Sequence, residues 1–301
     1  MKISLAICTW NRSRLLKQTL DSIVAMEKPS QIDWELVVVD NRSTDDTVKV
    51  VQAYQSSLPI KYVFEAQQGH SASRNAAIRE MTGDYVLWTD NDVQVDSGWL
   101  NAYAQGFAEH PRAAFFGGRI TPVFEAGIPN WIEATWEKCK PVFAARDLGN
   151  AQVPLGNGVY PYGANFAIRA DVQQEFQYDS QLGRKASGML GEDEISVLRK
   201  IDQAGHTGVW LPRASLKHII PADRATTQYI ANYFTGQGQT NILQGKVQKT
   251  VEVAKQEFLK NRIAWRIKRW IREPDEWVSH LIRANLSRGE YQALKQRQEL
   301  V

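Results

Sequence analysis

The sequence contains only two cysteines, Cys8 and Cys139, and neither belongs to a Cys-x-x-Cys pair or to a zinc-like cluster with histidine. This excludes a disulfide framework, and a reducing cytosol is expected. No apolar stretch approaches the ~20 residues that a membrane-spanning helix needs, and no signal-peptide cleavage pattern follows the first apolar run. We therefore expect a cytoplasmic protein, and peripheral attachment to the inner face of the cell membrane stays open.

Glycine-rich phosphate loops are also absent, because the chain has neither Gly-x-Gly-x-x-Gly nor Gly-x-x-x-x-Gly-Lys-[Ser/Thr]. This argues against a dinucleotide-binding Rossmann site and a P-loop site. Internal repeats and low-complexity tracts are missing as well. The 301 residues are 43% apolar and 23% charged, which is typical of a globular protein that buries one large core or one core with an appended subdomain.

Short β-rich runs alternate with helical patterns through the first half of the chain. The second run, Leu36 to Val39, is continuously apolar, as buried parallel strands tend to be. This order predicts a doubly wound α/β domain with right-handed crossovers. The expected strands are 3–8, 35–40, 60–64, 84–89, 113–116, 162–169 and 209–211. The expected helices are 14–26, 47–54, 71–81, 97–110, 131–138, 192–204 and most of 226–260.

Polar side chains follow the first two predicted strands. Thr9-Trp10-Asn11-Arg12 ends the first strand, with Arg14 close by, and Asp40-Asn41-Arg42-Ser43 ends the second. Both ends should face one cleft, where Asp40 would accept hydrogen bonds from a base or ribose and the arginines would suit phosphate oxygens. The same residue types are common in turns and helix caps, and the two interpretations stay open on composition alone.

Asp90-Asn91-Asp92 follows the apolar run Tyr85–Thr89, at the strand end where open α/β sheets bind ligands. A divalent cation such as Mg²⁺ or Mn²⁺, held by such oxygen ligands, would neutralise a departing diphosphate. The alternative is an ordinary acidic turn. The position after a buried strand favours the metal interpretation.

Four segments in order resemble family 2 glycosyltransferases of the GT-A fold, over about residues 3–220. They are Ile7-Cys8-Thr9-Trp10-Asn11-Arg12, Val37-Val38-Val39-Asp40-Asn41-Arg42-Ser43-Thr44-Asp45, Gly69-His70-Ser71-Ala72-Ser73-Arg74-Asn75-Ala76 and Trp88-Thr89-Asp90-Asn91-Asp92. The resemblance implies a doubly wound mixed sheet flanked by helices. It also implies transfer of a sugar with inversion, in which an acceptor hydroxyl attacks opposite the nucleoside diphosphate.

The resemblance also implies roles for single residues. Asp193 in Gly191-Glu192-Asp193 would be the general base, and Asp92 with His218 would hold Mn²⁺ or Mg²⁺. Without the resemblance, the favoured interpretation is that Asp193 complements a helix N-terminus and that His218 is structural. The residues expected to bind the nucleotide-sugar are Thr9, Trp10, Asn11, Arg14, Asp40, Ser43, Arg74, Asn75, Asp90 and Asn91. Those expected on the acceptor side are Gly163, Ala164, Asn165 and Glu192.

The C-terminal segment is basic, with 13 Lys and Arg against 7 Asp and Glu in residues 241–301. Leu259, Ile263 and Ile267 recur at helical spacing with Trp270-Ile271, and arginines lie on another face. Residues 255–272 would therefore bind an anionic membrane surface, or else pack the apolar stripe on the catalytic domain. Nucleic acid is not expected, because the basic residues are confined to one tail and no binding motif accompanies them.

The sequence thus predicts a catalytic domain at 1–240, divided into a nucleotide-sugar half at 1–119 and an acceptor half at 120–240, and a basic helical extension at 241–301. The predicted activity moves one sugar from a nucleoside diphosphate sugar, with UDP favoured, to a saccharide or lipid-linked acceptor in cell-surface glycan or glycolipid synthesis. Processive synthases of the family carry Gln-x-x-Arg-Trp, whereas this chain has Arg266-Ile267-Lys268-Arg269-Trp270. The alternatives are a sugar-nucleotide nucleotidyltransferase and a catalytically inactive nucleotide-sugar-binding scaffold.

Overall fold

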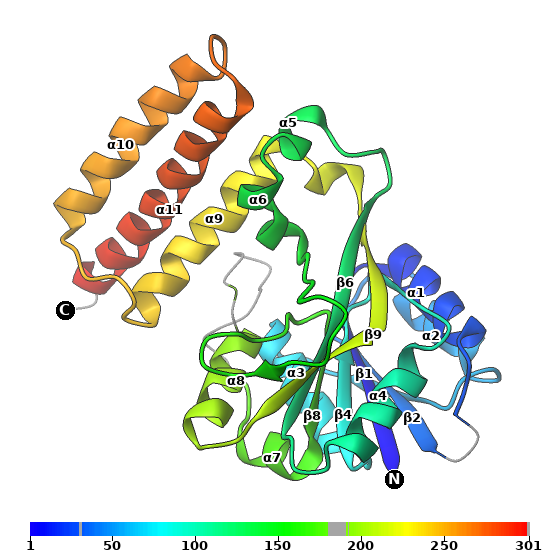
Figure 1. Cartoon of the computed structure of the whole chain (residues 1–301). Coiled ribbons are helices and arrows are strands. Elements are labelled where there is room, and N and C mark those ends of the chain that lie inside the picture. Colours follow the sequence, from blue (N-terminus) through cyan, green and yellow to red (C-terminus); the bar gives the residue numbers. More distant parts are fainter. Residues whose placement is uncertain (30–31, 180–190, 192, 300–301) are drawn as a thin grey trace. The chain divides into compact units, whose positions relative to one another are not determined.

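The computed structural model describes residues 1–29, 32–179, 191 and 193–299, and its elements are drawn in Figure 1. Over these residues the chain forms two compact units. The first comprises the described residues of 1–123, 144–179 and 193–219, and the second comprises those of 124–143 and 220–299 together with 191. Each unit is described by itself below. The sequence places residues up to 240 in the catalytic domain, whereas the structure groups 220–240 with the C-terminal helices.

Nine strands in the described part of the chain form one mixed sheet with the order β3-β2-β1-β4-β8-β6-β9-β5, and β7 pairs with β9. The strands are β1 (Lys2–Thr9), β2 (Asp33–Asp40), β3 (Ile60–Phe64), β4 (Tyr85–Thr89), β5 (Val93–Val95), β6 (Phe115–Phe124), β7 (Pro154–Leu155), β8 (Asn165–Arg169) and β9 (Gly208–Ile220). The first four strands are mutually parallel, and β8 runs antiparallel to β4.

Helices flank the sheet and make up most of the second unit. Those of the first unit are α1 (Ser13–Ala25), α2 (Thr47–Tyr54), α3 (His70–Glu80), α4 (Trp99–Glu109), α7 (Ala170–Glu175) and α8 (Asp193–Gln203). Those of the second unit are α5 (Asn130–Glu133), α6 (Trp136–Cys139), α9 (Thr227–Leu243), α10 (Val251–Lys268) and α11 (Pro274–Glu299), with short 3₁₀ turns at Lys140–Phe143 and Ala222–Arg224.

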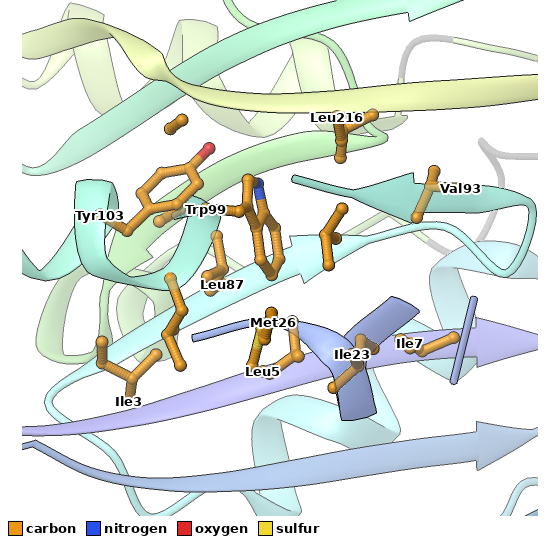
Figure 2. Close-up of a cluster of buried hydrophobic side chains, with 14 of the residues drawn as sticks. Ile3, Leu5, Ile7, Ile23, Met26, Leu87, Val93, Trp99, Tyr103 and Leu216 are labelled. Atoms are coloured by element: carbon orange, nitrogen blue, oxygen red, sulfur yellow. The ribbon is translucent and has the colours of Figure 1, made fainter. Parts of the chain in front are cut away.

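Two hydrophobic clusters cover the two faces of the sheet, because successive strand residues point to opposite sides. Ile3, Leu5 and Ile7 of β1 pack on one face with residues of α1, α2 and α4. Part of this cluster, including Trp99 and Tyr103 of α4, is drawn in Figure 2. Ala6 of β1 packs on the other face with residues of α3, α7 and α8. The three layers confirm the predicted α/β class.

Several elements differ from the sequence expectation. Strand β6 extends to Phe124, beyond the expected 113–116, and β5, β7 and α7 were not expected. Strand β9 has 13 residues instead of the three expected at 209–211, because it continues through a stretch whose alternate side chains are buried. The helix expected at 131–138 is divided into α5 and α6. The extension that was expected to be basic and helical ends in the 26-residue α11, whose length is supported by packing on its neighbours, since its own sequence is polar.

In the second unit, α11 packs closely on α9 through glycines. A methyl group built on Gly289 would lie 1.9 Å from the Thr235 carbonyl oxygen, and one on Gly238 would lie 2.1 Å from that of Leu286. Lys249 joins α10 to α11, because its Nζ lies 2.8 Å from both Glu257 and Glu290. Of the helices in the described residues, none combines the length and apolar character that a bilayer crossing requires.

Candidate functional site

The carboxyl ends of β1, β2 and β4 meet at one edge of the sheet in the first unit. Thr9 pairs in register with Asp40, and Ile7 pairs with Thr89, so the polar residues that follow these strands are neighbours. This is the edge at which parallel α/β sheets bind ligands. The structure therefore brings Thr9, Asp40 and the Asp90–Asp92 segment together, as the sequence predicts.

Side chains at this edge join the loops that follow the strands. The Ser43 hydroxyl accepts a hydrogen bond from the Asn11 backbone N–H at 2.9 Å, and the Asn11 side chain accepts one from the Thr44 N–H at 2.7 Å. Asn91 donates to the Thr9 hydroxyl at 2.9 Å. Asn11 and Arg42 have φ of +50° and +64°, a region unfavourable for residues other than glycine, so the contacts hold the loops in a strained conformation.

Asp40 is 1% exposed and both of its carboxylate oxygens accept hydrogen bonds. One comes from the Ser43 backbone N–H and the other from the Tyr62 hydroxyl, each at 2.9 Å. Burial and the hydrogen bond to Asp40 raise the pKa of Tyr62 to about 12. Tyr62 therefore remains a neutral donor that fixes the Asp40 carboxylate. The hydrogen bond from the Ser43 N–H to Asp40 forms the turn that was the alternative interpretation of these two residues. The nucleotide-binding role of Asp40 and Ser43 stays a prediction.

Asp92 contacts two side chains that suit an anion or a metal. The His218 Nε2 lies 3.4 Å from one carboxylate oxygen, and the Arg12 guanidinium lies 3.6 Å from the other. Asp92 and His218 are 4% and 6% exposed, and they are held together because Val93 of β5 pairs in register with His218 of β9.

The described residues contain no group of three or more His, Cys, Asp or Glu side chains that could hold a metal ion by itself. Asp92 and His218 supply one oxygen and one nitrogen ligand. Mg²⁺ is commonly bound by one or two carboxylates together with substrate phosphates and water. The residues present thus fit a divalent cation that is completed by a bound diphosphate, and they do not form a self-sufficient protein cage.

Asp193, the first residue of α8, is buried beside two basic side chains. The Arg74 guanidinium and the His70 Nδ1 both lie 3.2 Å from its Oδ2. Burial acts to raise the pKa of Asp193, but Arg74 and His70 outweigh it and hold the pKa well below its usual range. Asp193 is therefore an anion at neutral pH, fixed by two contacts from α3.

Arg74 is 2% exposed and is surrounded by aromatic rings. Its guanidinium carbon lies 5.0–5.6 Å from the ring centroids of Trp88, Phe166 and Tyr178. Burial opposes its charge, but the pKa of Arg74 is still raised, chiefly by Asp193. The predicted contact with the nucleotide stays a prediction. The observed role of Arg74 is to place Asp193.

Glu194 adds a second, partly buried acid to this cluster. Its carboxylate lies 3.8 Å from the Arg74 guanidinium and accepts a hydrogen bond from the Gly163 N–H at 3.3 Å. Burial and the neighbouring charge of Asp193 raise the pKa of Glu194 to about 8, against the opposing effect of Arg74. Glu194 is therefore mostly protonated at neutral pH, whereas the adjacent Asp193 is ionised.

Several predicted site residues serve the structure. Asn165 is fully buried, and its side chain accepts hydrogen bonds from Trp99 and Tyr103 and donates to the carbonyl oxygens of Arg119 and Ala214 at 2.8–2.9 Å. With all four hydrogen-bonding positions used in the core, its side chain does not line an acceptor surface. This corrects the acceptor-side assignment of Asn165.

The remaining predicted residues differ in exposure. Both ends of the Asn75 carboxamide bond the Tyr178 backbone, Ala164 is 1% exposed, and Trp10 is 39% exposed. Gly163, Asp90 and Arg14 are at least partly accessible. Glu192 lies outside the described residues. The contacts of Asn75 and the burial of Ala164 point to structural roles, and the binding roles of the accessible residues stay predictions.

Three residues of the site were missed by sequence reasoning. They are Tyr62, His70 and Glu194. His70 lies inside a segment that carries the family resemblance, so its position was a usable signal. Tyr62 is an ordinary strand residue, and nothing in the sequence links it to Asp40.

The described fold matches solved glycosyltransferase structures over nearly the whole chain. Staphylococcus aureus TarS 1–349 in complex with UDP-GlcNAc superposes with a TM-score of 0.58 and 15% identity, over 99% of this chain and 92% of that one. The mannosyltransferase PcManGT from Pyrobaculum calidifontis, in complex with GDP-Man and Mn²⁺, gives 0.59 and 16% identity, over 99% and 75%. These similarities confirm the GT-A fold.

Sequence comparisons point the same way. The succinoglycan biosynthesis protein ExoM of Rhizobium meliloti (strain 1021) is 25% identical over 247 residues, which is 80% of this chain and 74% of that protein. The glucosyl-dolichyl phosphate glucuronosyltransferase of Haloferax volcanii is 25% identical over 72% of this chain and 69% of its own. Residues 4–172 match the sequence model of glycosyl transferase family 2, and the chain belongs to that family.

Proposed function

We propose that this protein transfers one sugar from a nucleoside diphosphate sugar, preferably a UDP-sugar, to a hydroxyl of a saccharide or lipid-linked acceptor, with inversion at the anomeric carbon. The observation that carries the proposal is the placement of an anionic Asp193, held by Arg74 and His70, in the same unit as the Asp90–Asp92 strand end. Relatives that act in polysaccharide or glycolipid synthesis support a role in cell-surface glycan assembly.

Donor binding is assigned to the shared edge of β1, β2 and β4. Asp40 and Thr9 would contact the nucleoside, and Arg12 would offer a positive charge to the diphosphate. Asp92 and His218 would hold Mn²⁺ or Mg²⁺, which when bound supplies charge neutralisation for the leaving diphosphate. The TarS and PcManGT complexes hold UDP-GlcNAc and GDP-Man with Mn²⁺, respectively, on the same fold.

Asp193 would accept the proton of the acceptor hydroxyl as the new glycosidic bond forms. Its depressed pKa keeps it unprotonated before the acceptor arrives, and the two basic contacts fix its orientation. Glu194 is mostly protonated at neutral pH and would donate or share a hydrogen bond instead. The contacts that orient Asp193, from Arg74 and His70, support its assignment as the base ahead of Glu194.

The donor is tested first by thermal stabilisation with UDP-, GDP- and dTDP-sugars, with and without Mn²⁺, on wild type and Asp92→Ala. We expect one nucleotide class to stabilise the wild type, and we expect the effect to need both Mn²⁺ and Asp92. No stabilisation by any donor would refute the assigned activity. Stabilisation that is equal without Mn²⁺ would refute the metal site alone.

The base is tested by comparing Asp193→Asn with Glu194→Gln. Loss of a general base typically lowers the rate by about 10²–10⁴-fold, so we expect Asp193→Asn to lower kcat at least about 100-fold and to keep donor stabilisation. Glu194→Gln, which matches the neutral form of that side chain, should retain most of kcat. The opposite ranking would assign the base to Glu194.

A further inference from the structure

Helix α10 carries apolar side chains on two opposite sides. Its inner side holds Ala254, which is buried, with Phe258 and Trp265, which are half-buried. Residues four apart share a side of an α-helix, so Leu259, Ile263 and Ile267 form a second row. At 100° per residue, this row lies on the side of the helix opposite Ala254 and Trp265.

The second row is exposed. Leu259, Ile263 and Ile267 are 43%, 59% and 57% exposed, and Trp270 and Ile271, which follow the helix, are 76% and 67% exposed. We call these five residues the α10 outer face. Within the second unit, α10 lies alongside α11 (Figure 1). It packs on α11 with its other side, where Asn261 contacts His280 at 3.1 Å and Lys268 contacts Glu276 at 3.3 Å. Exposed rows of large apolar residues mark interaction surfaces.

Positive charge surrounds the α10 outer face. Residues 255–272 contain seven Lys and Arg and one Glu. Lys255, Arg262 and Arg266 lie along one flank of the row, Lys260 lies along the other, and all four are exposed. A second copy of this face would bring like charges together, so self-association is disfavoured, whereas an anionic surface would be attracted.

A cavity of about 410 Å³ opens beside the same flank, between α9, α10 and α11. Its lining includes Arg262, Arg266 and Arg288, together with Gln228 and Asn285, and none of the described residues that line it is an acid. Guanidinium and amide groups in this arrangement suit phosphate oxygens. The exposed apolar row of α10 therefore lies next to a basic cavity that suits the phosphates of lipid headgroups.

From these observations we propose that the α10 outer face docks on the surface of an anionic phospholipid bilayer, with its apolar row among the acyl chains and the flanking cations at the phosphates. Isoleucine and leucine on one side with lysine and arginine at its borders is the arrangement by which amphipathic helices lie in a membrane interface. The exposed Trp270 suits the headgroup level, where tryptophan is enriched. The proposal is independent of the donor and of the base assigned above.

Flotation of the full-length chain with lipid vesicles tests this docking. The wild type should float with vesicles of phosphatidylcholine containing about one third phosphatidylglycerol, and it should stay behind with pure phosphatidylcholine. Each exposed basic residue near an anionic membrane contributes about fivefold to binding. The pair Lys255→Gln/Lys260→Gln, which leaves the arginine-lined cavity intact, should therefore weaken binding about 25-fold.

The apolar row is tested by Ile263→Asn/Ile267→Asn. Burying an aliphatic side chain contributes at least about tenfold to binding, so this pair should weaken binding about 100-fold. The matched controls are Val24→Asn and Lys49→Gln, because Val24 is 38% exposed on α1 and Lys49 is exposed on α2. Both controls should float as the wild type does.

Two results would overturn the proposal. One is a wild type that does not float with anionic vesicles, and the other is flotation that the isoleucine variants leave unchanged. Stabilisation by the nucleotide-sugar is measured on every variant in parallel, and it should be unaltered. Failure of membrane docking and failure of the proposed glycosyl transfer are therefore separate outcomes.

Discussion

Replacing Glu194 by glutamine is expected to make the protein more stable than the wild type at pH 8 and nearly equal to it at pH 5. The pKa of Glu194 is raised to about 8 in the folded protein by burial and by Asp193, against an ordinary value of 4.5. The folded state therefore keeps a proton that the unfolded chain releases above about pH 4.5. The contribution of Glu194 to the stability of the wild type is fully present below that pH, and it is lost as the pH rises through about 8.

The size of the effect follows from the same two values. Each pH unit between them costs about 1.4 kcal/mol, so the loss by pH 8 reaches at most about 5 kcal/mol. Glutamine resembles the protonated acid and does not titrate. At roughly 2–4 °C per kcal/mol for a unit of this size, Glu194→Gln should melt on the order of 10 °C above the wild type at pH 8.

Differential scanning calorimetry at pH 5, 6.5 and 8 measures this difference. Asp193 does not contribute to the slope, because its lowered pKa keeps it ionised across the whole range. Glu175→Gln, at an exposed glutamate of α7, controls for the loss of a carboxylate. A melting difference between Glu194→Gln and wild type that is the same at pH 5 and pH 8 would refute the assigned charge state.

Two further substitutions test packing that the structure assigns. Gly289→Ala places a methyl group against the Thr235 carbonyl oxygen and should lower the free energy of unfolding of the helical unit by about 2 kcal/mol, although alanine favours a helix by roughly 1 kcal/mol. Arg283→Ala, at an exposed site on the same helix, should be nearly neutral in the same denaturant titration. Asn165→Leu leaves four buried hydrogen-bonding partners unsatisfied and should lower the free energy of unfolding by about 3 kcal/mol or more. A stable Asn165→Leu protein that has lost only transfer would instead restore the acceptor role.

The parallel strands and the helices between them could be predicted because their signals are local. Continuous apolar runs and amphipathic helices gave the boundaries of β2, α2 and β3 to within two residues. The length of β9 could not be predicted, because polar residues interrupt its apolar pattern after Leu211 and its pairing depends on strands far away in the sequence. The bounds of α11 could not be predicted for a related reason, since its support comes from packing on α9 and α10.

The sequence by itself determined the family, the strand ends that carry Asp40 and Asp92, and the amphipathic C-terminal helix, because each is written in contiguous residues. Only the tertiary structure decided which charges meet. Arg74 and Asp193 are 119 positions apart and touch because α3 and α8 lie on one face of the same sheet. The resemblance implied that Asp92 and His218 share a site, and the structure shows that the pairing of β5 with β9 brings them together. Asn165 is held in the core by partners on α4, β6 and β9. Such contacts depend on long-range packing, whose energy is shared over the whole core and leaves no local pattern in the chain.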